Sequence, residues 1–345
     1  MNRTAVDVLD PRYDAEPGYW TALRERAGLR ADWSWAVLTA QAWAARTPQP
    51  VTVLRDGAGP RGVVAAAWVT GRTRRHRFAR PSARRGWLGG LDIRAPGSSA
   101  QPGWWFADAG GDGGVTRLLE SYVPAMRAEL GPGFRGMLVR QVGEAGLDAV
   151  GGRFRLVRRT EDIAVLDLAG FGSREDWMNS LARKRKQNLR KIFRTFDADP
   201  SVAVRCVPGA EADPVAVAEV LRYNERKHHD VPIVPLPHFT GYLTALLRQP
   251  DVRVIEYVET ATGRLLAAAT LLDHPVRPIA RHWGALGRAD GGRSNLYFHF
   301  YGEAVRWAIA NGRGSVVFGK KMTEVKATLG ARLVPQYAAA VPLLR

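Results

Sequence analysis

A short run near residue 290 combines the residue types that bind phosphate. It contains Arg288, Gly291, Gly292, Arg293, Ser294 and Asn295. The run follows a predicted strand, residues 279–283, and leads into a predicted helix, residues 294–311. Glycine-rich turns before a helix N-terminus expose backbone N–H groups that hold phosphates. The spacing therefore predicts a donor cleft for a phosphate-bearing molecule, while an ordinary Asp-Gly-Gly turn with Ser294 as N-cap fits it equally well.

Candidates for acid–base chemistry lie on both sides of this turn. His282 ends the predicted strand, and strand ends face clefts in α/β sheets, so His282 is the preferred proton acceptor. His299 and Glu303 are i,i+4 neighbours on the following helix and could form an acid–base pair. A buried histidine with a purely structural role is the more common case, so both interpretations of His299 stay open.

An earlier helix ends in further polar residues. Tyr223, Lys227 and His228 could line the side of the site that receives an acceptor, or Lys227 and His228 could simply offset the helix dipole. We expect no metal site here, because the adjacent side chains of residues 228–230 diverge and no second cluster accompanies them.

A dense run of positive charge marks a second candidate site. One amphipathic helix is predicted over residues 173–196, with Ser173 as its cap. Its polar face carries Arg183, Lys184, Arg185, Lys186, Arg190, Lys191 and Arg194. Like charges at i,i+4 repel by roughly a few tenths of a kcal/mol per pair, which favours a bound polyanion such as a nucleic acid over a merely solvated face.

The whole chain is also basic. Its 345 residues include 50 Lys and Arg against 33 Asp and Glu, a formal net charge of +17. This balance favours a nucleic acid, a nucleotide-bearing co-substrate or peripheral contact with an anionic membrane. An arginine-rich coding bias explains the excess equally well, and the basic segment 71–85 is interpreted as a solvated loop or a phosphate contact.

Targeting features are missing from the sequence. It has no run of 18 apolar residues and no apolar signal core near Met1, so we expect a cytoplasmic protein without a transmembrane segment. Cys206 is the single cysteine, which excludes internal disulfides, and its predicted strand suggests a small buried side chain.

Helices and strands alternate in a similar order in both halves of the chain. This order predicts an α/β fold with α+β mixed sheets, built from tandem copies of one architecture. We place the first domain at residues 1–168. The second domain, residues 169–345, then contains both the basic helix and the donor cleft.

Four stretches, taken in order, resemble the GNAT-superfamily acyltransferases, and specifically the Fem-like branch related to peptidoglycan-bridge peptidyltransferases. They are the basic helix from Trp177 to Lys191, the block 281–284, the run 295–301 and the ending 319–330. The resemblance covers roughly residues 170–340, and the first half fits the degenerate first domain of such proteins.

The resemblance implies tandem GNAT-like domains that form an amide directly, without a covalently bound cofactor. The donor would be aminoacyl-tRNA or acyl-CoA. The acceptor would be a small-molecule or peptide amine, such as a peptidoglycan precursor or a secondary metabolite. Tyr301 or a backbone N–H of a strand would stabilise the oxyanion, and His282 or Glu303 would accept the proton. His299 would face the acceptor. Lys326 matches a recurring lysine of the family and would contact donor or substrate.

Two features bear on the choice of donor. Arg293 stands where the family's pyrophosphate loop ends in a small residue, which disfavours CoA, whereas the basic helix favours tRNA. An acyl-CoA-dependent N-acyltransferase is the alternative of the same class. A non-catalytic protein that binds RNA or a cell-wall precursor on the same scaffold is the alternative of another class.

Overall fold

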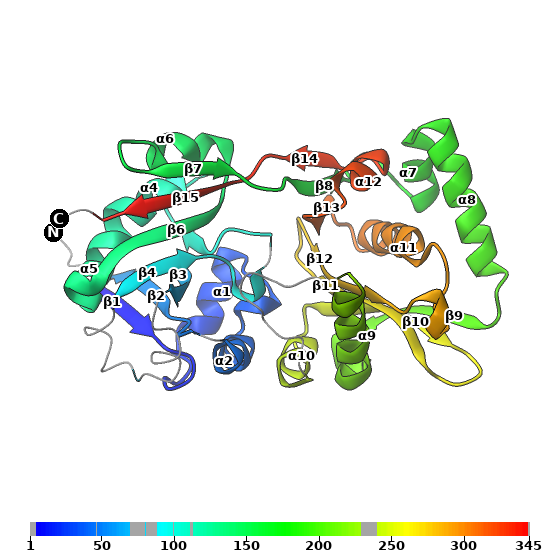
Figure 1. Ribbon diagram of the computed structural model, residues 1–345, viewed down its shortest axis with the longest axis horizontal. Helices are drawn as coiled ribbons and strands as arrows, with labels where there is room; N and C mark the ends of the chain where they lie inside the picture. The colour runs from blue at the N-terminus through cyan, green and yellow to red at the C-terminus, as the bar shows by residue number, and fades with distance from the viewer. Residues whose placement is uncertain are drawn as a thin grey trace. The chain divides into compact units, whose positions relative to one another are not determined.

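The computed structural model describes residues 5–45, 47–69, 80, 88–98, 100–110, 113–228 and 240–343 (Figure 1). They form two compact units: residues 1–161 with 335–345, and residues 162–334. The sequence places the boundary at residue 168 and everything beyond it in the second domain, whereas in the structure the last strand belongs to unit 1. The basic segment 71–85, except Arg80, lies outside the described residues.

Among the described residues, each unit contains one mixed sheet in which one parallel pair of strands is flanked by antiparallel ones, so the predicted tandem α/β fold is confirmed. In unit 1 the strand order is β1-β2-β3-β4-β6-β15-β7, with β5 paired to β3. The strands are β1 (Ala5–Leu9), β2 (Val51–Asp56), β3 (Gly59–Val69), β4 (Gly89–Ile93), β5 (Trp104–Phe106), β6 (Phe134–Val142), β7 (Leu156–Arg159) and β15 (Tyr337–Pro342). The helices are α1 (Trp20–Ala27), α2 (Trp35–Ala44), α4 (Gly113–Arg117), a π-helical turn (Leu118–Tyr122), α5 (Val123–Leu130) and α6 (Leu147–Val150).

Two apolar clusters hold unit 1 together. The larger contains Trp68, Ile93, Met126 and Val139 and packs α4 and α5 on one face of the sheet. The smaller contains Trp20 and packs α1 and α2 against the other face, over β2 and β3. Burying such side chains contributes about 1.5–3 kcal/mol each, which is the main stabilisation of this unit.

In unit 2 the strand order is β14-β8-β13-β12-β11-β10-β9. The strands are β8 (Ile163–Asp167), β9 (Val202–Pro208), β10 (Val252–Glu259), β11 (Leu265–Leu272), β12 (Ile279–Ala285), β13 (Ser315–Gly319) and β14 (Arg332–Val334). The helices are α7 (Arg174–Ser180), α8 (Arg183–Asp197), α9 (Pro214–Lys227), α10 (Thr240–Leu247), α11 (Leu296–Ala310) and α12 (Thr323–Thr328). The parallel strands β12 and β13 pair only at Ile279 and Val317 and separate beyond that point.

The predicted basic helix is two helices. Leu181 and Ala182 leave the helical conformation, with ψ angles of 159° and 140°, and so separate α7 from α8. Neither residue breaks helices by itself. Leu181 is buried in the core of unit 2, and the Trp177 indole donates to the Leu329 carbonyl at 3.0 Å, so tertiary packing decides this break. Ser173 caps α7 as expected, because its Oγ accepts from the Asp176 N–H at 3.1 Å.

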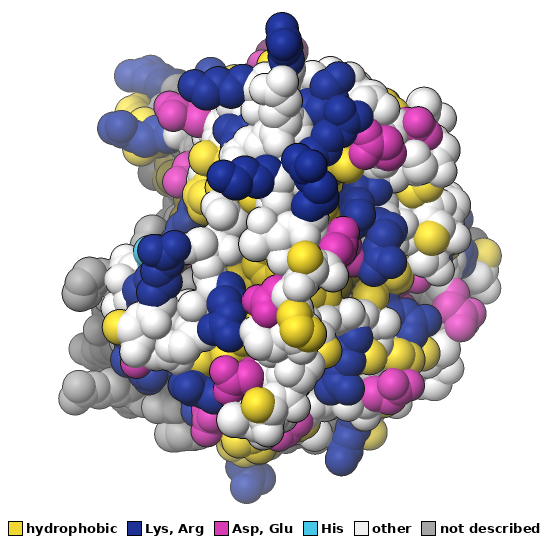
Figure 2. Space-filling view, turned by 90° about the vertical axis from the view of Figure 1, so that its right-hand side faces the viewer, with side chains coloured by type: hydrophobic (Ala, Val, Ile, Leu, Met, Phe, Trp, Pro, Cys, Tyr) yellow, Lys and Arg dark blue, Asp and Glu magenta, His cyan; other side chains and the backbone are white. Residues whose placement is uncertain are grey.

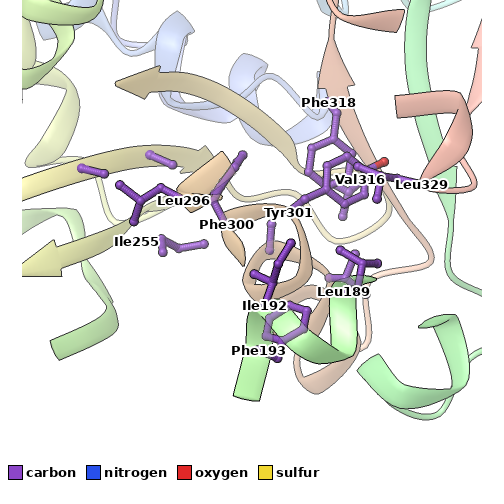
Figure 3. Packing of buried hydrophobic residues seen from close by; sticks show 14 of the residues in the cluster. Leu189, Ile192, Phe193, Ile255, Leu296, Phe300, Tyr301, Val316, Phe318 and Leu329 are labelled. Atoms are coloured by element: carbon purple, nitrogen blue, oxygen red, sulfur yellow. The ribbon is translucent and has the colours of Figure 1, made fainter. Parts of the chain in front are cut away.

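The apolar side of α8 packs against α11. Leu189, Ile192 and Phe193 point toward the side chains of α11 (Figure 3). Gly302 permits the close approach, because a Cβ there would lie 2.2 Å from the Phe193 ring. The prediction of a buried Cys206 is wrong: the residue lies on β9, the edge strand, and its side chain is exposed.

Candidate active site

The predicted donor cleft is a tightly bonded loop after β12. The Tyr223 hydroxyl, from α9, donates to Asp290 Oδ2 at 2.6 Å and accepts from the Gly287 N–H at 3.0 Å. Gly291 has a φ of +86°, and a Cβ at Gly292 would lie 2.0 Å from the Leu286 carbonyl oxygen. Both positions therefore require glycine. Their N–H groups donate within the loop, to the carbonyls of residues 288 and 287, and so are not directed at a ligand.

The two arginines of this loop have different surroundings. Arg288 is exposed, and its Nε donates to Ser294 Oγ at 2.6 Å. Arg293 is half-buried and donates to the Gly291 carbonyl at 2.6 Å. Asn295, in the left-handed conformation at φ +62°, precedes α11, and its side chain forms no cap hydrogen bond. Ser294 therefore braces Arg288, and the interpretation of Ser294 as N-cap is wrong.

His282 lies on the opposite face of the unit 2 sheet from α11. Its Nδ1 is 2.7 Å from Thr270 Oγ1, and its ring packs near that of Tyr242 on α10. The next residue, Trp283, stacks on Phe300 of α11 at 4.8 Å. Since successive strand residues point to opposite faces, His282 and the polar residues of α11 do not meet.

His299 and Glu303 are not paired with each other. His299 is buried, and its Nδ1 lies 3.0 Å from the Tyr257 hydroxyl. Burial lowers the pKa of His299 to about 3, with the nearby cations Arg174 and Arg306 acting in the same direction, so the ring is neutral. Glu303 accepts instead from Arg174 at 2.5 Å and from Arg306. The structural interpretation of His299 thus describes its surroundings better than an acid–base pair.

Tyr301 is fully buried between two aromatic rings. It stacks on Phe318 at 3.7 Å and on Trp177 at 5.8 Å, and Figure 3 shows it alongside Phe318. Among the described residues, its hydroxyl finds no hydrogen-bond partner. Burial raises the pKa of Tyr301 well above its ordinary value, so the hydroxyl stays protonated and can only act as a neutral donor or acceptor.

Lys326 supports a loop from inside the protein. Its side chain is buried, and its Nζ donates to the carbonyls of Phe318 at 2.7 Å, Gly319 at 3.3 Å and Lys320 at 2.6 Å. This ammonium group neutralises the dipoles of the chain that leaves β13. The loop also contains Lys321 and Met322 at positive φ, a conformation that costs roughly 1–3 kcal/mol per residue and is common at functional sites.

The predicted site residues thus lie in separate places within unit 2. The loop after β12 brings Arg288 and Arg293 together with Tyr223, which braces the loop. Lys326 of α12 instead contacts the carbonyls of residues 318–320. Lys227 and His228 are exposed at the end of α9.

Sequence reasoning missed three residues around the polar groups of α11. Arg174 and Arg306 bind Glu303, and Tyr257 contacts the ring of His299. The only local feature that could have predicted one of these contacts is the i,i+3 spacing of Glu303 and Arg306 on one helix. Nothing local in the sequence points to Arg174 or Tyr257, because both come from other elements.

Most of the basic residues of α8 face solvent. Arg183, Lys184, Arg190, Lys191 and Arg194 are exposed, and Arg185 and Lys186 are half-buried. Figure 2 views the side of the molecule that lies on the right in Figure 1, and Lys and Arg side chains gather in its upper part, where α8 lies. Arg190 pairs with Glu175 of α7, and the Arg185 guanidinium lies 5.2 Å from the Phe298 ring of α11. The first turn of α8 contains no acidic residue.

The fold is shared with several solved structures. L-PGS from Bacillus licheniformis matches with a TM-score of 0.61 and 10% identity, covering 96% of this chain and 92% of that one. The C-terminal domain of a proposed lysylphosphatidylglycerol synthetase from Agrobacterium fabrum matches with a TM-score of 0.56 and 15% identity, covering 93% and 92%. FemX matches with a TM-score of 0.54 and 10% identity, covering 86% and 90%. No protein-family model and no curated protein matches the sequence.

These similarities confirm the predicted resemblance at the level of fold: the chain shares its overall fold with FemX, with L-PGS and with the synthetase domain. Among the residues that the structure describes, no helix has the length and apolar character needed to cross a membrane.

Proposed function

We propose that the protein transfers an aminoacyl group from aminoacyl-tRNA to a small-molecule or peptide amine. The observation that carries this proposal is the exposed cationic face of α8, which pairs with one carboxylate, Glu175, among the described residues. Such a face suits a polyanionic backbone, because phosphate contacts release condensed counterions. The fold supports the same reaction class, since one neighbour is named for lysylphosphatidylglycerol, an aminoacylated lipid.

In this reaction the amine nitrogen attacks the ester carbonyl of the aminoacyl-tRNA. A C–N bond forms, the C–O bond to the terminal ribose breaks, and the proton lost by the amine ends on the ribose oxygen. Such direct transfer depends mainly on orientation and on stabilising the oxyanion. We assign donor phosphates to Arg288, Arg293 and the loop that Lys326 supports.

Substitutions can distinguish between the two proposed proton acceptors, His282 and Glu303. Tyr301 would donate a hydrogen bond to the oxyanion after its aromatic stack opens, and either His282 or Glu303 would accept the proton. Because His282 and Glu303 belong to opposite faces of the sheet, they cannot serve one reacting atom together. One of the variants His282→Ala and Glu303→Gln should therefore retain most of the transfer rate.

The loop after β12 weighs against acyl-CoA as the donor. The N–H groups of Gly291 and Gly292 are already bonded to carbonyls of the same loop, so they are not offered to a pyrophosphate. An acyl-CoA-dependent N-acyltransferase is the alternative that the experiment must exclude.

The decisive experiment measures transfer of a labelled amino acid from charged tRNA to a panel of amines, with and without ribonuclease. A triple variant, Arg183→Glu, Lys184→Glu and Lys191→Glu, should reduce kcat/KM for tRNA by about 10²-fold or more. Its plot of log affinity against log salt should become shallower by roughly 0.7–0.9 for each phosphate contact that the substitutions remove. A matched control, Arg248→Glu with Arg332→Glu, reverses exposed charges elsewhere in unit 2 and should behave like wild type.

Transfer that survives ribonuclease and needs only acyl-CoA would overturn the tRNA proposal. RNA binding without any transfer, unchanged in the His282 and Glu303 variants, would establish the non-catalytic alternative.

A further inference from the structure

The sheet of unit 1 has an open, apolar half-face. Leu91, Met137 and Val341 point into the core beneath α4 and α5. Since strand residues alternate, the residues between them point to the other face, where they line a groove of about 520 Å³. The lining residues come from β3, β4, β6, β7 and β15 and from the segment just before β7.

Glycines form the floor of this groove. A Cβ at Gly90 would lie 2.7 Å from the Gly136 carbonyl oxygen, and a Cβ at Gly136 would lie 3.0 Å from that of Val341. The strand register places Gly90 beside Gly136 and Gly136 beside Pro342. The two glycines therefore keep this part of the floor shallow.

Large hydrophobic side chains surround the floor and point into solvent. Val69 is 50% exposed, Phe154 64% and Leu156 54%, and all three line the groove. Leu88, directly before the lining residue Gly89, is 60% exposed. Phe154 also has a φ of +67°, which is unusual for a bulky residue. A contiguous apolar patch of this kind marks an interaction surface.

Arginines flank the apolar patch. Arg135 lines the groove, and the Arg153 guanidinium lies 4.8 Å from the Phe154 ring. The register places Arg158 on β7 beside Ala338, one row from Leu156. Among the described lining residues, the only carboxylate is Asp92, which is buried and neutralised by Arg140 at 2.6 Å. The patch is thus apolar in the centre and cationic at its edge.

We propose that this half-face docks onto an anionic phospholipid bilayer, with Phe154, Leu156 and their neighbours entering the interfacial layer. The arginines would then lie at the depth of the lipid phosphates, a combination of apolar burial and charge attraction that binds peripheral proteins to membranes. A second copy of the chain suits the surface less well, because a symmetric contact would bring Arg135 and Arg153 of both copies together. A single soluble ligand would fill the groove but leave the outward-pointing rim uncovered.

Co-sedimentation of the full-length protein with vesicles tests the proposal. Binding to vesicles of phosphatidylcholine and phosphatidylglycerol should exceed binding to phosphatidylcholine alone by about ten-fold, and should weaken as salt rises. Phe154→Glu with Leu156→Glu should reduce binding to mixed vesicles by about ten-fold or more. Val276→Glu, at an equally exposed apolar residue of unit 2, is the matched control and should bind like wild type.

A fluorescent label locates the contact. Because Cys206 is the only cysteine, a Cys206→Ser chain with Phe154→Cys carries one environment-sensitive dye at the patch, and one with Val276→Cys carries it elsewhere. The dye at 154 should brighten and shift to the blue with mixed vesicles, and the dye at 276 should not. Three results would overturn the proposal: no vesicle binding, binding that Phe154→Glu with Leu156→Glu leaves intact, or a dimer in solution that these substitutions dissociate. None of these outcomes bears on aminoacyl transfer, which is measured separately.

Discussion

The polar residues of α11 are each held by partners distant in sequence. His299 lies against Tyr257 of β10, and Glu303 lies between Arg174 of α7 and Arg306. Buried polar groups need such partners, because an unsatisfied one costs about 1–3 kcal/mol. The contacts that satisfy the hydrogen-bonding capacity of His299 and Glu303 therefore also hold α7 and β10 against α11.

Stability should depend on pH through His299. Burial lowers its pKa to about 3 in the folded protein, while an unfolded histidine takes up its proton near pH 6.5. The unfolded state then binds more protons between these values, so stability is complete above about pH 6.5 and falls as the pH drops, by up to about 1.4 kcal/mol per pH unit. Urea unfolding of wild type and His299→Gln between about pH 7 and pH 5 measures this effect. Parallel profiles for the two proteins would contradict it.

The Arg174–Glu303 pair should be energetically coupled. Glu303→Gln weakens the buried end of the pair and should lower stability by roughly 2–3 kcal/mol, while Arg174→Met removes the guanidinium, whose central carbon also lies 3.9 Å from the Phe193 ring centroid. A double-mutant cycle should give a coupling of about 1–3 kcal/mol. Arg332→Met, at an exposed arginine, is the control, and additive losses would show that the two groups act independently.

Among the helices, α8 has one apolar side that packs into the core of unit 2 and one basic side that faces solvent. Its apolar residues Leu189, Ile192 and Phe193 are buried, while the basic ones cover the other side. Gly302 lets α11 approach α8 closely enough for Phe193 to lie over the helix backbone. The contact between Gly302 and the Phe193 ring is therefore one of those that fix the position of the basic face.

Filling that contact should displace the two helices. Gly302→Ala should destabilise unit 2 by roughly 1–3 kcal/mol, because the added methyl group overlaps the Phe193 ring in a packed core. Combining it with Phe193→Leu should recover part of the loss. Chemical denaturation checks both variants, and a Gly302→Ala protein as stable as wild type would show that the ring moves freely.

Across the molecule as a whole, the C-terminal strand completes the sheet of unit 1. β15 lies between β6 and β7 and pairs with both, so β7 reaches this sheet only through the last residues of the chain. Unit 1 is therefore complete only when unit 2, which precedes β15 in the chain, has been synthesised.

Removing β15 should affect the two units differently. A chain that ends at Val334 leaves β6 without a neighbour on one side and exposes Met137 and Val139 of the core. Hydrogen exchange should then quicken in β6 and β7 while β10 and β11 keep their protection. Uniform loss of protection in both units would contradict the division into two compact units.

Local patterns in the sequence are enough to predict the tandem α/β fold, the capping of α7 and the cationic character of α8. Each depends on neighbours within a few residues: alternation of apolar side chains, a Ser-x-x-Asp box, a run of Lys and Arg. The break at Leu181, the exposure of Cys206 and the return of β15 to the first sheet could not be predicted, because each depends on contacts between residues far apart in sequence.

For the candidate site, too, some features could be predicted from the sequence and others depend on the fold. Composition and spacing are enough to establish that phosphate-binding residue types follow β12 and that positive charge gathers on α8. Which polar groups meet follows only from the fold. Successive residues of β12 face opposite sides of the sheet, so His282 is separated from His299 and Glu303, while Arg174 is brought to Glu303 from 129 positions away in the chain.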